Sequence, residues 1–161
     1  MNLDVRALGD PTLRPERFFV GQTSGFGLVR NPFGKVMRRY AVTTRGSSGN
    51  AYGALQVDQT LYFDNGEIEA FNWLITEAVG DRYVFAEPRL GTGLFAELRD
   101  QDFVYAFRTR LPPPWTRLRL PLRFAGRMSL VAQETVISNI WVSMLGIPFA
   151  TFTAFHRHTT P

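Results

Sequence analysis

The chain has 161 residues, of which 45% are hydrophobic and 14% aromatic, and its net charge is +4 at neutral pH. This composition excludes an intrinsically disordered chain, since such chains are poor in hydrophobic and aromatic residues. There is no cysteine, which excludes disulfides, thiolate catalysis and cysteine-bound metals. The length predicts one domain, residues 1–161, and the basic charge allows contact with an anion or a membrane surface without requiring it.

The first residues of the chain show no apolar segment of the kind found in signal peptides. No run approaches the ~18 apolar residues that suggest a membrane-spanning helix. We therefore expect a cytoplasmic protein as the sequence stands, or a periplasmic or membrane-associated protein if a leader has been removed.

One short helix is predicted near the N-terminus. Asp10 and Pro11 have the residue types of a helix N-cap and a first helical position, and residues 16–19 would follow as a turn or two of helix. Phe18 and Phe19 would then close one end of the fold.

Apolar and polar residues alternate with a period of two over most of the remaining chain, which is typical of strands with one covered face. Turn-forming residues separate the alternating runs at short intervals. In Asp64-Asn65-Gly66, the Asn-Gly pair predicts a type I′ turn, which needs positive φ at both central residues. The pattern predicts an all-β fold of about nine or ten strands, either a sandwich or an up-and-down barrel. The clearest runs are 36–44, 55–63, 71–76 and 102–108.

A ladder of arginines is the most conspicuous basic feature. One parity of residues 117–124 carries Arg117, Arg119 and Arg123, and the other carries leucines and Phe124. The apolar parity predicts an inward face. The arginines would then lie in water or contact an anionic headgroup or a membrane surface. Pro121 favours an irregular strand, because it cannot donate to a ladder, and Gly126 is predicted to end this strand.

Several glycine- and aromatic-rich motifs follow one another along the chain. They are Phe19-x-Gly21, Gly25-Phe26-Gly27, Phe33-Gly34-Lys35-Val36, Asp64-x-Gly66-Glu67 with Trp73 after it, and Asn139 in VISNIW. In these motifs, over about residues 14–157, the chain resembles a family of small bacterial proteins, the domain-of-unknown-function family 3833. The resemblance implies a lipocalin-like fold, a closed antiparallel barrel around a small ligand cavity. It implies no established activity.

The chain departs from the family's pattern at three places. Ala70 and Phe71 stand where members tend to carry an arginine. Members usually carry an acidic pair and a tryptophan before the late strand, and this chain has neither at residues 125–128. Ile140 stands where an arginine commonly follows the late asparagine. A chemistry shared through those polar groups would therefore be lost or altered in this chain.

The only histidines, His156 and His158, lie two residues apart near the C-terminus and would point to one side of a strand. We predict no metal site, because no third ligand is near in sequence, and we expect the segment to be a frayed end. Some lipocalin-like barrels hold haem through one late-strand histidine, so the resemblance leaves His156 open as an axial haem ligand. No other cofactor is predicted.

Acid–base catalysis would need a carboxylate or a histidine held in a closed site. Glu67 and Glu69 share the parity of Trp73, and Glu134 shares the parity of Met128, so each of these acids is a candidate inward group. No serine has a nucleophile-elbow pattern around it, and residues 91–93 lack the rest of a nucleotide-binding glycine motif. Nucleic-acid binding is not predicted, because most aromatic residues fall on the apolar parity and would be interior.

A barrel of about eight to ten strands has room inside for one small ligand. We hypothesise non-enzymatic binding or carriage of a small hydrophobic or amphipathic ligand, such as a lipid or fatty acid, in this cavity. An isomerase or hydratase-like enzyme acting on a lipid-like substrate, with Glu67 or Glu134 as base, is the alternative. A third reading is that the aromatic residues only fill the barrel. The candidate ligand-binding residues are Tyr40, Phe63, Phe71, Trp73, Phe85, Phe103, Tyr105, Asn139 and Trp141.

Overall fold

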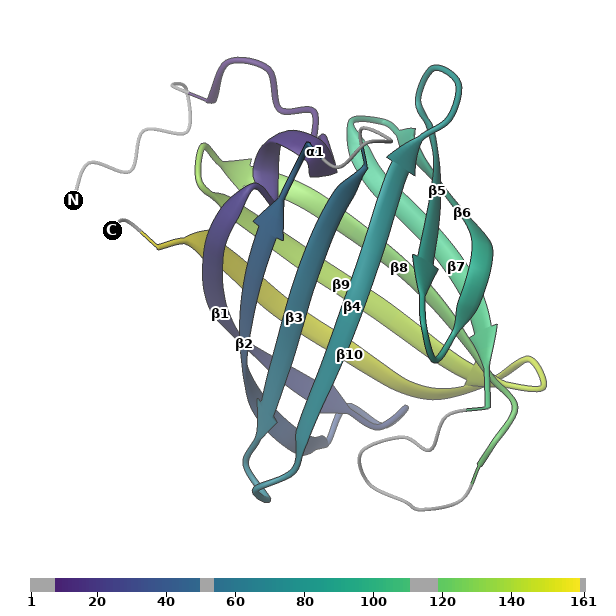
Figure 1. The fold of residues 1–161 in the computed structure, drawn as a ribbon. Coiled ribbons are helices and arrows are strands. Elements are labelled where there is room, and N and C mark those ends of the chain that lie inside the picture. The colour runs from purple at the N-terminus through teal and green to yellow at the C-terminus, as the bar shows by residue number, and fades with distance from the viewer. Residues whose placement is uncertain (1–7, 50–53, 111–118, 160–161) are drawn as a thin grey trace.

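The strands of this protein form a closed antiparallel barrel, in the hydrogen-bonded order β1-β10-β9-β8-β7-β6-β5-β4-β3-β2 (Figure 1). The structure is a computed structural model that describes residues 8–49, 54–110 and 119–159. The elements are α1 (Pro15–Phe18), β1 (Gly21–Arg30), β2 (Val36–Ser47), β3 (Leu55–Phe63), β4 (Ile68–Glu77), β5 (Arg82–Glu87), β6 (Gly91–Arg99), β7 (Asp102–Thr109), β8 (Leu122–Ala132), β9 (Thr135–Met144) and β10 (Ile147–His158). The predicted all-β barrel is confirmed.

The barrel closes where its first strand meets its last. β1 pairs with β10 from Thr23 opposite His158 to Arg30 opposite Thr151. The C-terminal segment is therefore a paired strand, and the expectation of a frayed end around His156 was wrong. Among the described residues, no helix has the length and hydrophobicity needed to cross a membrane.

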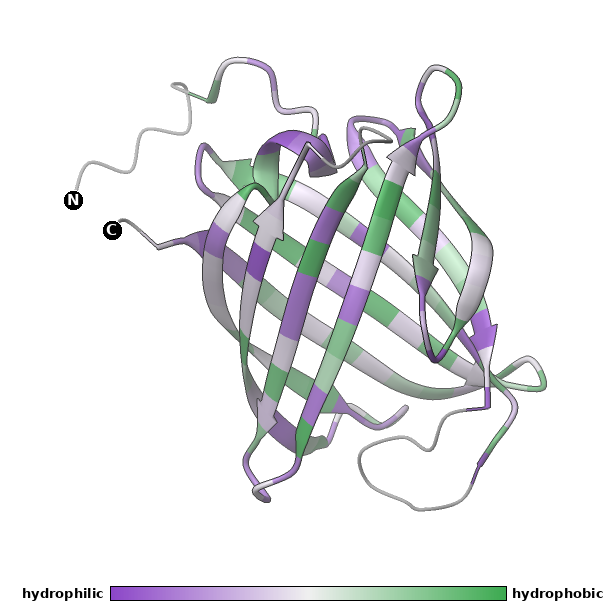
Figure 2. Cartoon of the chain, viewed as in Figure 1, coloured by the Kyte–Doolittle hydropathy of each residue, from purple (hydrophilic) through white to green (hydrophobic). Residues whose placement is uncertain are grey.

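Hydrophobic and hydrophilic residues alternate along the strands, as the sequence predicted (Figure 2). The inward side chains form two buried clusters rather than one. The first lies near α1 and includes Phe19, Val57 and Phe103. The second includes Tyr40 and Phe152.

The helix is shorter and later than its sequence signals suggested. It begins after Arg14, with Pro15 at its first position, and the Asp10 carboxylate instead accepts a hydrogen bond from the Thr12 amide at 3.0 Å. Phe18 and Phe19 are both buried and their rings pack edge to face at 5.0 Å. They close one end of the barrel, as predicted.

The turn between β3 and β4 differs from expectation. Asn65 does not have positive φ, so the predicted type I′ turn is wrong, and only Gly66 (φ 89°) is left-handed there. The Gly66 amide donates to the Phe63 carbonyl, which makes a type I turn followed by a left-handed glycine. Positive φ at two successive central residues occurs instead at Asp100 and Gln101, between β6 and β7.

Two glycines inside strands each lie under a tyrosine ring. Gly126 was predicted to end its strand, but it lies within β8, directly opposite Tyr105. A Cβ atom on Gly126 would lie 2.1 Å from Tyr105 Cζ, and one on Gly27 would lie 2.3 Å from Cζ of Tyr40, its cross-strand partner. A glycine within a strand often marks such a close approach. Both tyrosine rings therefore lie flat along the barrel wall.

We expect Gly126→Ala to destabilise the protein by about 2 kcal/mol, because the new methyl group overlaps the Tyr105 ring. Urea unfolding measures this cost. In a Tyr105→Ala background the same substitution should cost less than about 0.5 kcal/mol, since the overlap is gone. An equal cost in both backgrounds would contradict the packing described here.

Candidate functional site

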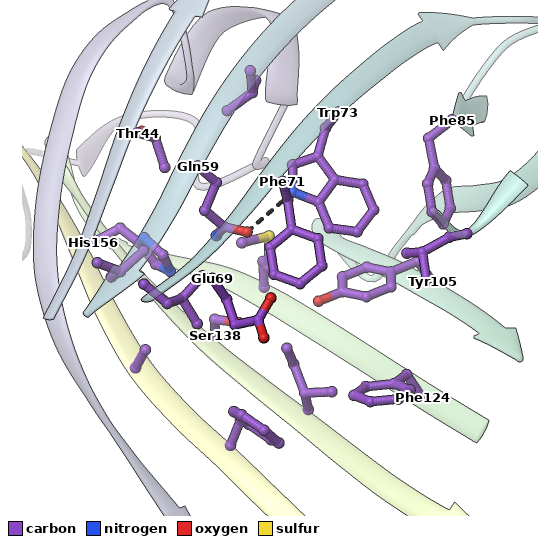
Figure 3. Close-up of a pocket in the computed structure, with 18 of the residues that line it drawn as sticks. Thr44, Gln59, Glu69, Phe71, Trp73, Phe85, Tyr105, Phe124, Ser138 and His156 are labelled. Carbon is purple, nitrogen blue, oxygen red and sulfur yellow. Dashed lines mark hydrogen bonds between the residues drawn. The ribbon is translucent and has the colours of Figure 1, made fainter. Parts of the chain in front are cut away.

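A cavity of about 250 Å³ lies inside the barrel, with walls drawn from both core clusters. Phe19 lines it at the α1 end, and Phe124 and Phe152 line it on the side of the second cluster. Figure 3 shows aromatic side chains around this space, with the polar side chains of Thr44, Gln59, Glu69, Ser138 and His156 among them. The volume exceeds that of an engineered apolar cavity of ~150 Å³ that binds benzene, and falls just below the ~300–1,000 Å³ of pockets for drug-sized ligands.

Most of the side chains chosen from the sequence meet at this cavity. The predicted residues that line it are Tyr40, Phe63, Phe71, Trp73, Phe85, Phe103 and Tyr105. Their contact with a ligand stays a prediction. Asn139 and Trp141 do not join them.

Trp141 was assigned to the wrong face of its strand. Its side chain is 51% exposed, whereas its neighbour Val142 is buried. Asn139 shares the outer parity, and its side-chain oxygen accepts a hydrogen bond from Thr153. The inward residues of β9 include Ser138 and Ile140, which line the cavity and were missed. Both parities of β9 carry bulky apolar residues, so alternation alone does not reveal its inner face.

Trp73 occupies the centre of the aromatic wall. Its ring stacks on Phe71 at 5.5 Å between centroids and meets Phe85 at 5.9 Å. Its indole N–H donates to Gln59 Oε1 at 3.0 Å, so its polar atom is satisfied inside the barrel (Figure 3). This leaves the Trp73 ring as a fixed apolar surface toward the cavity.

Within the part of the chain that the structure describes, the cavity reaches solvent beside an interruption in the strand pairing. β4 pairs with β5 only from Leu74 onward, and β6 pairs with β7 only as far as the Ala96–Tyr105 pair. The first half of β4 and the last half of β7 therefore lack ladder partners on the sides that face the short β5–β6 hairpin. Glu69 and Arg89, which line the cavity here, have side chains 34% and 38% exposed. We call this place the side opening, formed by residues 69–73, 89–90 and 107–109.

Arg89, at the tip of the β5–β6 hairpin, links this tip to β4 at the side opening. Its Nη1 donates to Glu69 Oε2 at 2.9 Å, its Nη2 donates to the Ala70 carbonyl at 2.5 Å, and its guanidinium lies 4.5 Å from the Phe71 ring centroid. Glu87, only 2% exposed, accepts the Arg89 backbone amide at 2.6 Å. The sequence pattern did not single out Arg89, because its contacts come from a turn about 20 residues away from β4.

His156 projects from β10 into the cavity (Figure 3). Its side chain is 3% exposed, and its Nδ1 is buried without a hydrogen-bond partner. Burial lowers the pKa of His156 from 6.5 to about 4, with no charged group contributing. The imidazole is therefore uncharged at neutral pH.

Tyr105 and Thr44, two further polar side chains in the wall, have partners within the protein. The Tyr105 hydroxyl hydrogen-bonds with the Ser138 side chain, and burial raises the Tyr105 pKa, which keeps the phenol protonated. Thr44 shares a hydrogen bond of 2.5 Å with Thr23. Burial also raises the pKa of Tyr40.

The carboxylates proposed as bases do not enter the cavity. Glu67 is exposed in the turn before β4, and Glu134 is exposed in the turn between β8 and β9. Glu69 does line the cavity, but it is paired with Arg89. The enzyme hypothesis in its stated form was therefore wrong about its candidate bases.

No cluster of three His, Asp or Glu residues suited to a metal occurs within residues 8–49, 54–110 and 119–159. His156 lines the cavity, and its role as an axial haem ligand stays an open alternative. Arg119 and Arg123 are exposed, in agreement with the alternation of their segment. Arg117 lies outside the described residues.

The fold and cavity define a lipocalin-like barrel. Residues 1–158 match the family described as "Protein of unknown function (DUF3833)". The chain belongs to this family, and the resemblance inferred from the motifs is confirmed. No protein with a curated description matches the sequence.

Several solved structures share the fold. An S-type phycobiliprotein lyase, CPES, from Guillardia theta is 7% identical, with a TM-score of 0.67 over 92% of this chain and 94% of that one. A protein with unknown function from the DUF3598 family of Nostoc punctiforme is 15% identical, with a TM-score of 0.65 over 92% of this chain. This chain spans 50% of that protein. The Mycobacterium tuberculosis protein Rv2717c is 13% identical, with a TM-score of 0.57 over 92% and 99% of the two chains. At these identities the likeness establishes the fold alone.

We expect Arg89→Met to loosen the tip of the β5–β6 hairpin, because it removes charge-assisted hydrogen bonds to Glu69 and Ala70. Amide hydrogen exchange at Leu90, which donates to the Glu87 carbonyl, should accelerate about tenfold. Arg99→Met is the matched control, since it breaks an exposed ion pair with Glu97 at the far end of the hairpin. Equal exchange at Leu90 in both variants would contradict this role of Arg89.

The stability of the protein should fall in acid because of His156. The folded-state pKa of about 4 lies below the ordinary 6.5, so the unfolded chain binds an extra proton between these values. His156 should therefore cost nothing above pH 7 and about 3 kcal/mol once the pH has fallen to 4. His156→Phe should remove this part of the pH dependence in urea unfolding. The same loss in the variant as in the parent protein would show that His156 is not the cause.

Proposed function

We propose that this protein binds, without catalysis, a small hydrophobic or amphipathic ligand such as a lipid in its barrel cavity. The observation that supports this most directly is the preformed cavity of about 250 Å³, walled by aromatic side chains and reached through the side opening. A core filled by its own side chains would leave no such space. The ligand is one ring with a short chain, or the end of a longer chain that extends through the side opening.

The energetics are compatible with useful affinity. Burying about eight to ten methylene-sized groups gains roughly 6–8 kcal/mol at ~0.8 kcal/mol each. Association costs ~4–15 kcal/mol, but the cost falls towards the lower end when a cavity is already formed. Trp73 is held by Gln59, and Tyr105 by Ser138, so these walls need little reordering on binding.

Carriage would require loading and release, and the geometry offers a route for both. The side opening is bordered by the tip of the β5–β6 hairpin. This tip contacts β4 through the Arg89 side chain and through Glu87, which accepts the Asn72 amide at 3.4 Å. Contact of Arg119 and Arg123 with an anionic membrane surface remains part of this proposal, and their exposure is compatible with it.

The experiment is calorimetric titration of the protein with n-butylbenzene, an uncharged probe of suitable size. We expect measurable binding that is weakened at least tenfold by Ala154→Phe, because Ala154 lines the cavity and a phenyl ring would occupy it. Ala106→Phe places the same ring on the exposed outer face of β7 and is the matched control. It should bind butylbenzene as the parent protein does. Absence of binding to the parent protein, or equal binding by all three proteins, would overturn the proposal.

A further inference from the structure

The cavity contains one polar atom for which the protein supplies no partner. Within the described residues, His156 Nδ1 is the only buried side-chain nitrogen or oxygen among the cavity-lining residues that lacks a hydrogen bond. A buried polar atom left unpaired costs free energy, so native structures nearly always satisfy such atoms. The His156 imidazole lines that space (Figure 3), so a ligand bound there lies beside the ring that carries this unpaired atom.

The charge of the lining restricts what that ligand can be. Among the described lining residues, the charged side chains are Glu69 and Arg89, and they are paired with each other. A second carboxylate oxygen, Glu87 Oε1, lies 3.9 Å from Arg89 Nε, so this one guanidinium faces two carboxylates. An anionic group entering here would meet no unpaired cation and would be repelled by Glu69 and Glu87. Placing an unpaired charge in an apolar site is strongly unfavourable.

The imidazole does not supply the missing positive charge. His156 is uncharged at neutral pH because its pKa is lowered to about 4. Its ring packs edge to face against Phe19 at 6.2 Å between centroids, which adds an apolar neighbour. In its neutral form the imidazole accepts a hydrogen bond at one nitrogen and donates at the other.

From this geometry we propose that the ligand is uncharged and amphipathic, and that its hydroxyl or carbonyl group hydrogen-bonds to His156 Nδ1. The inference rests on the proposed function and narrows it. A hydroxyl donates to Nδ1 in one tautomer, and a carbonyl accepts from Nδ1–H in the other. The apolar part of the ligand lies against Trp73, Phe85 and Phe152. A fatty-acid carboxylate, by contrast, is not accommodated with its headgroup inside the barrel.

The test compares three probes that differ at one end only: n-butylbenzene, 3-phenylpropan-1-ol and 3-phenylpropanoate. Each is titrated at pH 7.5 by calorimetry. We expect the alcohol to bind at least tenfold more tightly than the carboxylate. His156→Phe should weaken alcohol binding about fivefold, the effect of one lost hydrogen bond, and change butylbenzene binding less than twofold. His158→Phe, on the same strand but outside the cavity lining, is the control and should leave all three affinities unchanged.

The outcomes separate this inference from the proposed function. Carboxylate binding as tight as alcohol binding would overturn the inference and leave the cavity as a ligand site. Alcohol binding that His156→Phe does not weaken would overturn the role of His156. Failure of butylbenzene and the alcohol alike to bind the parent protein would overturn the proposed function, and this inference with it. The first and third comparisons use the parent protein alone, so they hold even if a variant does not fold.

Discussion

The hydrogen-bonded closure between β1 and β10 is the constraint from which the other features follow. It joins residues near the start of the described chain to residues near its end, from Thr23–His158 to Arg30–Thr151. Once ten strands close, the width of the barrel is set by strand number and tilt rather than by side-chain volume. The inward residues of opposite walls then pack as two clusters, and the cavity lies between them. Closure also leaves no unpaired sheet edge at this seam.

Local sequence choices decide how much of that interior stays empty. Tyr40 and Tyr105 have large side chains, yet each lies along the wall because its cross-strand partner is a glycine. Because these two glycines have no side chain, the tyrosine rings fit against the wall and leave space in the barrel interior. The short β5–β6 hairpin acts in the same direction, since the start of β4 and the end of β7 have no strand pairing with it, and the side opening lies there.

The sequence predicted the fold well, because a period of two is a local signal that many strands repeat. It placed Phe71, Trp73 and Tyr105 on the inner face correctly. It failed at Trp141, where both faces of β9 are apolar and the register depends on pairing with β8 and β10. It also mistook buried His156 for part of a frayed end, since only the long-range pairing of β10 with β1 and β9 shows that the strand continues to His158. The Glu69–Arg89 pair joins a strand to a distant turn, and no local pattern contains such a contact.

The central claim is that the barrel encloses usable apolar space beside Trp73, Tyr105 and His156. A crystal structure determined under xenon pressure tests this most directly, because xenon occupies dry apolar cavities and scatters strongly. The account predicts at least one xenon atom inside the barrel, between these side chains. A barrel without xenon, whose aromatic side chains have collapsed into one continuous core, would contradict it.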